Sequence, residues 1–232
     1  MMTITDKHAF FYTEWPSNFC KTRFIWTAFG ETHEFFCTEQ AFMWAKAKFF
    51  GDECSAQKIL EVSVGSRDPM VCKRLGRKVK NYVDSEWDKV RYKYMLEPNV
   101  ERFRQDENLK AKILDPKFEG KTFVEASPLD GIWGIRLGME TPLNELDDES
   151  KWNGKNLLGQ VITEARRIVM KACPYFKKTD DKGVLLEVTD EDKRELAEYE
   201  TRLVEKFKRV RDLKENEERM LYEYLKRKYE EK

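Results

Sequence analysis

Glycines alternate with tryptophans, an aspartate and an arginine in two neighbouring segments, residues 129–138 and 152–159. The first reads Leu-Asp-Gly-Ile-Trp-Gly-Ile-Arg-Leu-Gly and the second reads Trp-Asn-Gly-Lys-Asn-Leu-Leu-Gly. Glycine lets the backbone approach a ligand closely and adopt positive φ angles. Indole rings offer flat surfaces for a base or a sugar. The two segments therefore predict the wall of a pocket for a nucleotide-like ligand.

The charges of the chain cancel. Its 232 residues include 43 Lys and Arg and 43 Asp and Glu, so no net charge attracts a polyanion over long range. Proteins that coat nucleic acid nonspecifically draw their affinity from many phosphate contacts, and the composition argues against that class. A small pocket that binds one modified nucleotide remains allowed. The length suits one domain with a full core and an appendage, or two small domains.

Cysteine and histidine usage points to a reducing compartment. The five cysteines stand singly along the chain, as expected of reduced and mostly buried thiols. Only His8 and His33 are present, and neither is clustered with cysteines, which argues against a structural zinc site. The N-terminus lacks an apolar signal core, and no run approaches ~18 apolar residues. We expect a cytoplasmic protein with no metal, no cofactor and no membrane partner.

The sequence predicts a mainly α-helical body with a small β element near its N-terminus. Aromatic and β-prone residues in 24–29 and 34–37 flank Gly30-Glu31, which predicts a β-hairpin. Thr38 has the chemistry of a helix N-cap, and helix formers follow it to residue 48. Further helices are expected over 53–64, 69–76, 85–106, 109–114 and 156–171, and short strands over 9–12 and 123–126. This order is neither a βαβ array nor a repeat.

Residues 184–232 contain no glycine or proline. Apolar side chains recur there every three or four residues with charged side chains between them, which predicts one long amphipathic helix or a helical pair. We take 1–175 as one domain and 176–232 as a charged helical extension. Packing of this extension on the body is favoured. A homodimer through the helix is the alternative, less favoured because the heptad spacing is irregular.

Six segments, in order along residues 8–172, resemble the YbiA/NADAR family of N-glycosidases. They are Ser17-Asn18-Phe19; Thr38-Glu39-Gln40 through Lys46; Asp68-Pro69-Met70-Val71 with Leu75-Gly76-Arg77; Trp87; Asp130-Gly131-Ile132-Trp133-Gly134; and Gly154-Lys155-Asn156-Leu157-Leu158-Gly159 running on to Arg166. Two features depart from the family pattern. The family often has a histidine where Gln40 stands, and the loop between Gly138 and Trp152 is acidic where some members are short and glycine-dense. The acidic loop leaves the substrate preference open.

The resemblance implies a YbiA-like helical fold that cleaves the bond between a ribose C1 and an amine. Substrates of similar proteins are ADP-ribose attached to guanine and the phosphoribosyl-amino-pyrimidine intermediates of riboflavin synthesis. We favour ADP-ribosylguanine, as a nucleotide or in DNA or RNA, because the appendage and the acidic insertion suit a larger or regulated target. Riboflavin-intermediate cleavage is the first alternative. A non-catalytic module that binds ADP-ribose or NAD is the second.

Three residues are candidates for the chemistry. Glycosidic cleavage passes through a cation-like sugar carbon, and an amine leaves slowly unless it is protonated. Glu39, in the first turn of its helix, and Asp130, within the Asp-Gly-Ile-Trp-Gly segment, are expected to supply acid–base catalysis and cation stabilisation. Lys46 follows Glu39 by two helical turns and lies on the same face. A desolvated lysine can attack an opened sugar as a Schiff base, and it can equally bind a phosphate.

Six further residues are candidates for binding the substrate. Trp87 and Trp133 are expected to stack on a flat base, and Gly134 lies beside the second indole. Asn18, Asn156 and Arg77 are expected to orient ribose hydroxyls and phosphate, with the guanidinium suited to a bidentate grip. The helix that begins near Asn156 also offers unpaired N–H groups to an anion. No strand–glycine–helix unit supports NAD as a redox cofactor.

Overall fold

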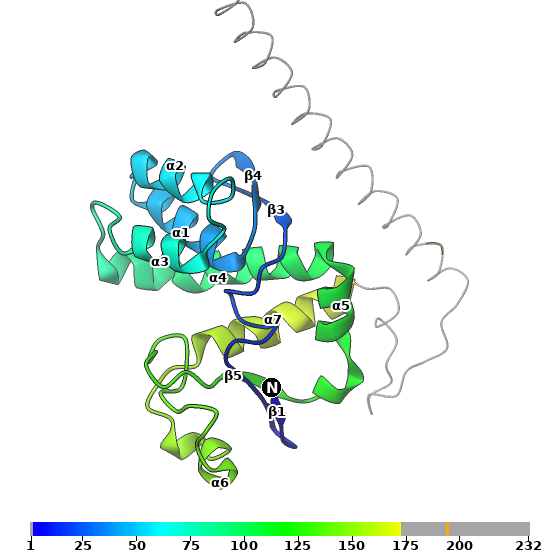
Figure 1. Cartoon of the computed structure of the whole chain (residues 1–232). Helices are drawn as coiled ribbons and strands as arrows, with labels where there is room; N and C mark the ends of the chain where they lie inside the picture. The colour runs from blue at the N-terminus through cyan, green and yellow to red at the C-terminus, as the bar shows by residue number, and fades with distance from the viewer. Residues whose placement is uncertain (1, 173–193, 195–232) are drawn as a thin grey trace, which may run out of the picture. The chain divides into compact units, whose positions relative to one another are not determined.

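The computed structural model describes residues 2–172 and Arg194 (Figure 1). The predicted helix over 184–232, the boundary at residue 175 and the homodimer through the extension therefore lie outside the described residues, apart from that one arginine. In the part of the chain that is described, no helix combines the length and the apolar character needed to cross a bilayer.

A small mixed sheet joins the N-terminus to the middle of the chain. Its strands are β1 (Thr3–Ile4), β2 (His8–Phe11) and β5 (Thr122–Glu125), in the order β1-β2-β5. β1 pairs antiparallel with β2, and β2 pairs parallel with β5, so that His8 lies opposite Thr122 and Phe11 opposite Glu125. The two parallel strands consequently end at the same edge of the sheet, next to residues Tyr12 and Ala126.

The predicted hairpin is confirmed. β3 (Phe24–Ala28) and β4 (Glu31–Phe35) pair antiparallel across a two-residue loop. Phe29 and Gly30 in that loop have φ angles of 53° and 78°, the pattern of a type I′ turn, whose twist matches that of the flanking strands. Trp26, Phe35 and Trp44 pack on one another and tie the hairpin to the helices.

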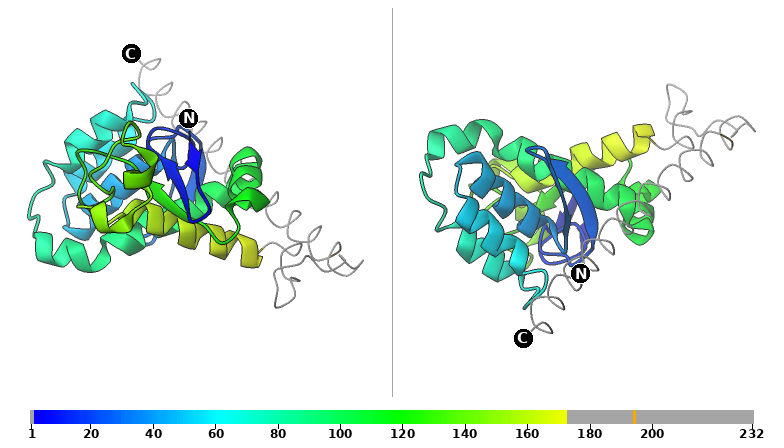
Figure 2. Two further views of the ribbon diagram at one scale, coloured as in Figure 1. Left: turned by 90° about the horizontal axis from the view of Figure 1, so that it is seen from below. Right: turned by 90° about the horizontal axis from the view of Figure 1, so that it is seen from above.

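Four helices form one layer beside the hairpin (Figures 1 and 2). They are α1 (Thr38–Phe49), α2 (Glu53–Glu61), α3 (Pro69–Gly76) and α4 (Asp84–Gln105). α1 packs against each of the other three. A Cβ on Gly76 would lie 1.9 Å from the Sδ of Met43, so the absence of a side chain at this position allows α3 to approach α1 closely.

The N-cap of α1 differs from the prediction. Cys37, with φ −165° and ψ 160°, is the cap, and its Sγ accepts the N–H of Gln40 at 3.4 Å. Thr38 is already inside the helix. The side chain of Gln40 reaches back past the N-cap to accept the N–H of Phe36 at 3.0 Å, and its Nε2 donates to the carbonyl of Ile59 at 2.8 Å. The residue that departs from the family pattern thus stabilises the helix start.

The second layer contains the sheet and the remaining helices. α5 (Glu107–Leu114) follows α4, and α7 (Leu157–Ala172) packs on β5, where the hydroxyl of Thr163 accepts the N–H of Phe123 at 2.9 Å. α6 (Leu143–Leu146) and two short 3-10 turns, at Pro116–Phe118 and Glu149–Lys151, lie in the connections.

The fold class is therefore mixed α/β in the described residues. Helices predominate, as the sequence predicts, and the short strands expected over 9–12 and 123–126 are present as β2 and β5; their parallel pairing is what the sequence did not predict. More than a hundred residues separate these strands, and the pairing of distant segments leaves no local pattern in the sequence. A buried cluster of Phe10, Val124, Ala126, Ile135 and Leu146 fastens the glycine-rich segment to this sheet.

Candidate active site

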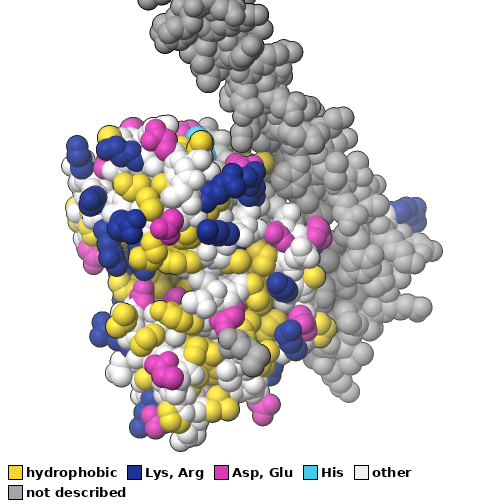
Figure 3. Space-filling model, in the orientation of Figure 1, with side chains coloured by type: hydrophobic (Ala, Val, Ile, Leu, Met, Phe, Trp, Pro, Cys, Tyr) yellow, Lys and Arg dark blue, Asp and Glu magenta, His cyan; other side chains and the backbone are white. Residues whose placement is uncertain are grey.

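A cavity of about 630 Å³ lies where the two layers meet. Its lining comes from α1, from α3 and the loop after it, from the start of α4, from the chain that follows β2 and β5, and from residues 127–133. Figure 3 shows the hollow between the helical part and the loops, with hydrophobic side chains on both sides and basic side chains gathered on the helical side. The volume is in the range of pockets that enclose nucleotide-sized ligands.

The structure brings most of the predicted site residues to this one cavity. The lining residues among them are Asn18, Glu39, Lys46, Arg77, Trp87, Asp130 and Trp133. They come from five separate parts of the chain, between residues 18 and 133. Gly134 and Asn156 are not among the lining residues. The early helix and the late glycine-rich turn therefore face each other across a hollow space.

Glu39 lies in the first turn of α1 and is 2% exposed. Its Oε2 accepts a hydrogen bond from Nδ2 of Asn18, and its backbone N–H donates to the carbonyl of the same residue at 2.9 Å. Burial raises the pKa of the Glu39 carboxyl to about 7, the charge of Asp130 adds to the rise, and Lys73 opposes it. Near neutral pH this carboxyl can both accept and donate a proton.

Asp130 is fixed by its own turn. Its Oδ1 accepts the backbone N–H groups of Ile132 at 3.0 Å and Trp133 at 2.9 Å, an Asx-turn arrangement. The carboxylate is partly exposed and lines the cavity. The same turn places the indole of Trp133 at the cavity, so the geometry of the acid and the geometry of the ring are set together.

A third carboxyl, which the sequence analysis missed, lines the same cavity. Glu125 is the last residue of β5 and is 8% exposed. Its Oε2 is buried and has no hydrogen-bond partner among the described residues. Burial raises the pKa of Glu125 to about 8, with a further rise from the charge of Asp130. The only signal of its role in the sequence is its position, since Glu125 is an acid that follows an apolar strand residue and precedes the glycine-rich segment.

Four basic side chains, Lys46, Lys73, Arg77 and Arg91, line the cavity, and the guanidinium of Arg91 is paired with Asp84 and Asp88. The Nζ of Lys46 donates to the carbonyl of Gly76 at 3.0 Å and lies 3.9 Å from the centre of the Tyr82 ring. Burial lowers the pKa of the Lys46 ammonium, and the neighbouring Arg91 lowers it further. Such a cluster of donors is suited to anionic oxygens.

The two predicted stacking residues are exposed to different degrees. Trp87 is 3% exposed, and its ring is stacked on Tyr94 with 5.7 Å between centroids and 7° between planes. Trp133 is partly exposed, and its ring meets Phe42 edge-on at 5.2 Å. Trp133 therefore has ring surface available to a ligand, whereas Trp87 forms part of the packed floor.

Gly134 and Asn156 act on the backbone around Glu125 instead of facing the hollow. The amide of Asn156 is buried, with its Oδ1 accepting the N–H of Glu125 at 3.0 Å and its Nδ2 donating to the carbonyl of Phe123 at 3.1 Å. A Cβ on Gly134 would lie 2.9 Å from the carbonyl oxygen of Glu125. The substrate contacts that the sequence analysis predicted for these two residues are not what the geometry provides.

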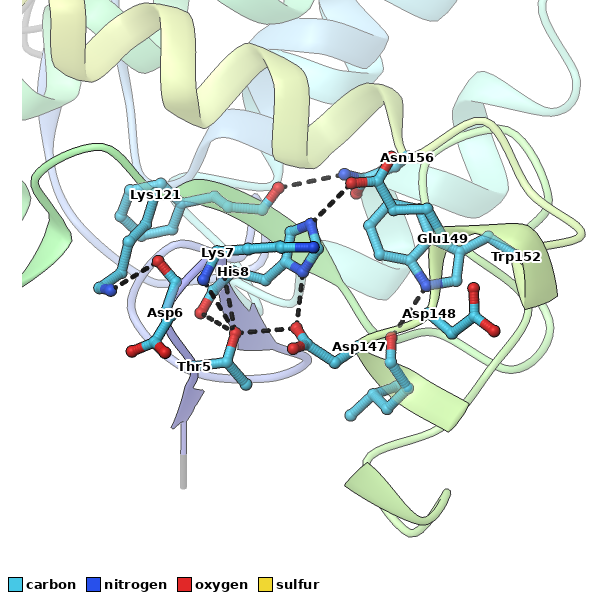
Figure 4. Close-up of polar contacts among 12 residues, drawn as sticks. Thr5, Asp6, Lys7, His8, Lys121, Asp147, Asp148, Glu149, Trp152 and Asn156 are labelled. Atoms are coloured by element: carbon cyan, nitrogen blue, oxygen red, sulfur yellow. Dashed lines mark hydrogen bonds and ion pairs between the residues drawn. The ribbon is translucent and has the colours of Figure 1, made fainter. Parts of the chain in front are cut away.

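The acidic loop also lies away from the cavity. Of its acids Glu140, Glu145, Asp147, Asp148 and Glu149, none lines the hollow. Figure 4 shows that two of them hold the buried His8 of β2, whose Nδ1 lies 2.7 Å from Asp147 Oδ1 and whose Nε2 lies 3.1 Å from Glu149 Oε1. The ring of Trp152 packs against the same imidazole. The loop is thus fastened to the sheet, and its acidity is no longer an argument for a larger substrate.

The arrangement can carry out acid–base chemistry on an anionic ligand. Carboxyls with pKa values of about 7 and about 8 are in opposite protonation states over part of the neutral range, which is the condition for one group to act as base and another as acid. Within the described residues, no three His, Cys, Asp or Glu side chains are grouped to hold a metal ion.

Comparisons with known proteins agree with one another. The NADAR domain model matches residues 3–170. N-glycosidase R617 of Acanthamoeba polyphaga mimivirus is 36% identical over 175 residues, covering 70% of this chain and 96% of that protein. Protein irg-1 of Caenorhabditis elegans is 35% identical over 135 residues, covering 57% of this chain and 60% of that protein. The NMR structure of the E. coli protein YbiA shares the fold, with a TM-score of 0.54 and 24% sequence identity. The match covers 77% of this chain and 93% of YbiA.

Proposed function

The chain belongs to the NADAR domain family and is a hydrolase of N-glycosyl bonds, and we propose that the bond it cleaves joins a ribose C1 to an amine. The observation that carries the proposal is the cavity itself. It combines Glu39, Glu125 and Asp130 with four cations in one hollow. A relative that is 36% identical, 96% of whose length is covered, bears the name N-glycosidase.

The roles of the residues follow from their surroundings. Asp130 is the anion that stabilises positive charge as it develops on C1 in the transition state. Glu39, with its pKa near 7, accepts the proton of the attacking water. Lys46 lies two helical turns from Glu39 and either attacks an opened sugar or binds a phosphate. Its lowered pKa favours the attack on the sugar. Its hydrogen bond and its contact with an aromatic ring favour a charged lysine that binds phosphate.

We further propose that the substrate carries ADP-ribose on guanine. Lys46, Lys73 and Arg77 line the cavity beside the paired Arg91, and several cations suit a diphosphate better than the single phosphate of a phosphoribosyl-amino-pyrimidine. Trp133 offers a partly exposed ring on which a base can stack. Hydrolysis of the riboflavin-pathway intermediate stays the alternative substrate, and a non-catalytic ADP-ribose-binding or NAD-binding module is the alternative function.

Release of the leaving amine separates these functions. The full chain is incubated with ADP-ribosylated guanosine and, separately, with phosphoribosyl-amino-pyrimidine, and the released amine, guanosine or amino-pyrimidine, is measured by chromatography. We expect release from the first substrate. Release from the second alone identifies the riboflavin-type activity, and release from neither, with micromolar binding of ADP-ribose, identifies the module.

Two conservative variants serve as catalytic controls. Glu39→Gln retains an oxygen that can accept from Asn18, and Asp130→Asn retains an oxygen that can accept the N–H groups of Ile132 and Trp133. Both preserve local geometry and remove the carboxylate. We expect each to lower the rate on the order of 10²–10⁴-fold. Rates equal to that of the wild-type chain in both variants would contradict the assignment.

A further inference from the structure

Glu125 is held in an unusual position for a glutamate. It terminates a strand in the interior of the protein, its side chain is 8% exposed, and it reaches the cavity with Oε2 unpartnered among the described residues. A buried carboxyl oxygen without a donor loses the stabilisation that hydrogen bonding would give its charged form. The arrangement favours a carboxyl that carries a proton into the cavity.

The backbone of Glu125 is fixed by three contacts from the late glycine-rich segments. Its N–H donates to Oδ1 of Asn156 at 3.0 Å, and its carbonyl accepts the N–H of Ile135 at 3.1 Å. Gly134 packs against that carbonyl so closely that a Cβ would lie 2.9 Å from the oxygen. These contacts give a structural reason for the motif residues that do not line the cavity: they position the end of β5.

We propose that Glu125 is the proton donor of the reaction and delivers its proton to the amine nitrogen that leaves ribose C1. This inference rests on the proposed N-glycoside hydrolysis and assigns a step of it to a residue that the sequence motifs do not single out.

The step balances with the groups already described. As the C1–N bond breaks, its electron pair stays on the nitrogen, which takes the proton from the Glu125 carboxyl. Water forms the new C1–O bond and gives a proton to the carboxylate of Glu39. The products are a ribose hydroxyl and a neutral amine. Glu125 is left ionised and Glu39 protonated, and exchange of one proton with solvent restores both.

The charges that face Glu125 agree with this order of transfer. Asp130 from the turn and Glu39 from α1 disfavour a negative charge at this position, and Lys73 from α3 opposes them. The pKa of Glu125 lies at about 8 and that of Glu39 at about 7. The higher pKa of Glu125 makes it the better proton donor of the two carboxyls and leaves Glu39 as the acceptor.

The test is single-turnover release of guanosine from ADP-ribosylated guanosine between pH 5 and pH 10, with wild-type chain, Glu125→Gln and Glu125→Asp. For the wild-type chain we expect a bell-shaped dependence of the rate on pH, in which the rate rises through about pH 7 and falls through about pH 8. Glu125→Gln should lower the maximum on the order of 10²–10⁴-fold and abolish the fall at high pH. Glu125→Asp, which keeps a carboxyl but draws it back, should retain that fall at a reduced rate.

Binding and stability measurements separate a proton donor from a structural residue. Binding of ADP-ribose by calorimetry should stay within a few-fold of wild type in Glu125→Gln, and the thermal melting point should not fall. The inference is overturned by a Glu125→Gln rate within a few-fold of wild type, or by a slow variant that keeps the fall at high pH. If Glu125→Gln does not fold, loss of the high-pH fall in Glu125→Asp overturns it as well. A wild-type chain that releases neither guanosine nor amino-pyrimidine from the two substrates refutes the proposed function itself, which is a different result.

Discussion

Replacing Glu39 by glutamine should make the protein more stable at high pH. Burial raises the pKa of this carboxyl from 4.5 to about 7 in the folded chain. Between those two pH values the folded state keeps a proton that the unfolded state has lost. The contribution of this carboxyl to folding stability is therefore fully present below pH 4.5 and is lost as the pH rises through about 7. Each unit of pKa difference corresponds to 1.36 kcal/mol, so ionisation of this carboxyl lowers the free energy of unfolding by about 3 kcal/mol at high pH.

Glutamine carries no such cost because it does not ionise, and it retains an acceptor for the Asn18 amide. Urea unfolding, followed by tryptophan fluorescence at pH 4.5, 6, 7.5 and 9, gives the free energy of unfolding by linear extrapolation. We expect Glu39→Gln and the wild-type chain to agree within about 1 kcal/mol at pH 4.5. By pH 9 the variant should be the more stable by about 3 kcal/mol.

Ionisation of Glu125 also lowers the stability of the folded chain, over a wider pH range, because its pKa is raised from 4.5 to about 8. Combining Glu39→Gln with Glu125→Gln should therefore flatten the decrease of stability with pH further than either change alone. Glu61→Gln, which removes an exposed carboxyl from α2, should leave the wild-type pH dependence in place. If the free energies of unfolding of Glu39→Gln and the wild-type chain differed by the same amount at every pH from 4.5 to 9, the burial argument would be refuted.

Three further predictions concern other parts of the molecule. Lys46→Arg keeps the charge but cannot form a Schiff base, so amine release should be abolished if the lysine attacks the sugar; near-normal turnover would leave it only the phosphate-binding role. Gly154→Ala should lower the free energy of unfolding in urea by about 3 kcal/mol, because its Cβ would lie 2.2 Å from the carbonyl oxygen of Gly134; a loss below about 1 kcal/mol would show that the two segments separate easily. His8→Ala removes the imidazole that holds Asp147 and Glu149 and should cost about 2 kcal/mol with the amine-release rate unchanged, and a parallel loss of rate would mean that the acidic loop influences the cavity.

The sequence predicted the local elements well because their signals are local. The turn at Gly30 requires positive φ, and Pro69 has no N–H to lose at a helix start, so both mark their elements unambiguously. The cap of α1 was displaced by one residue, to Cys37, because a thiol is a weak acceptor and gives little sequence signal.

The sequence also identified most of the cavity. Polar and aromatic residues within glycine-rich or helix-start motifs, such as Glu39, Asp130 and Trp133, line it together. Motif membership did not distinguish a residue that faces the ligand from one that supports it, and for this reason Asn156 and Gly134 were misplaced. Only the structure separates the two, because the distinction depends on which side of the end of β5 each residue occupies.

The amino-acid sequence by itself determined the helices, the hairpin and the residue types that gather at the cavity, since propensities, caps and turn chemistry act over a few residues. Tertiary structure alone decided the parallel pairing of β2 with β5, the attachment of the acidic loop to His8, and the burial of Glu125 beside Asp130 and Glu39. The physical reason is that desolvation and charge–charge interaction depend on which distant segments are packed together. A glutamate at the end of a strand becomes a neutral acid only when other parts of the chain exclude water from it.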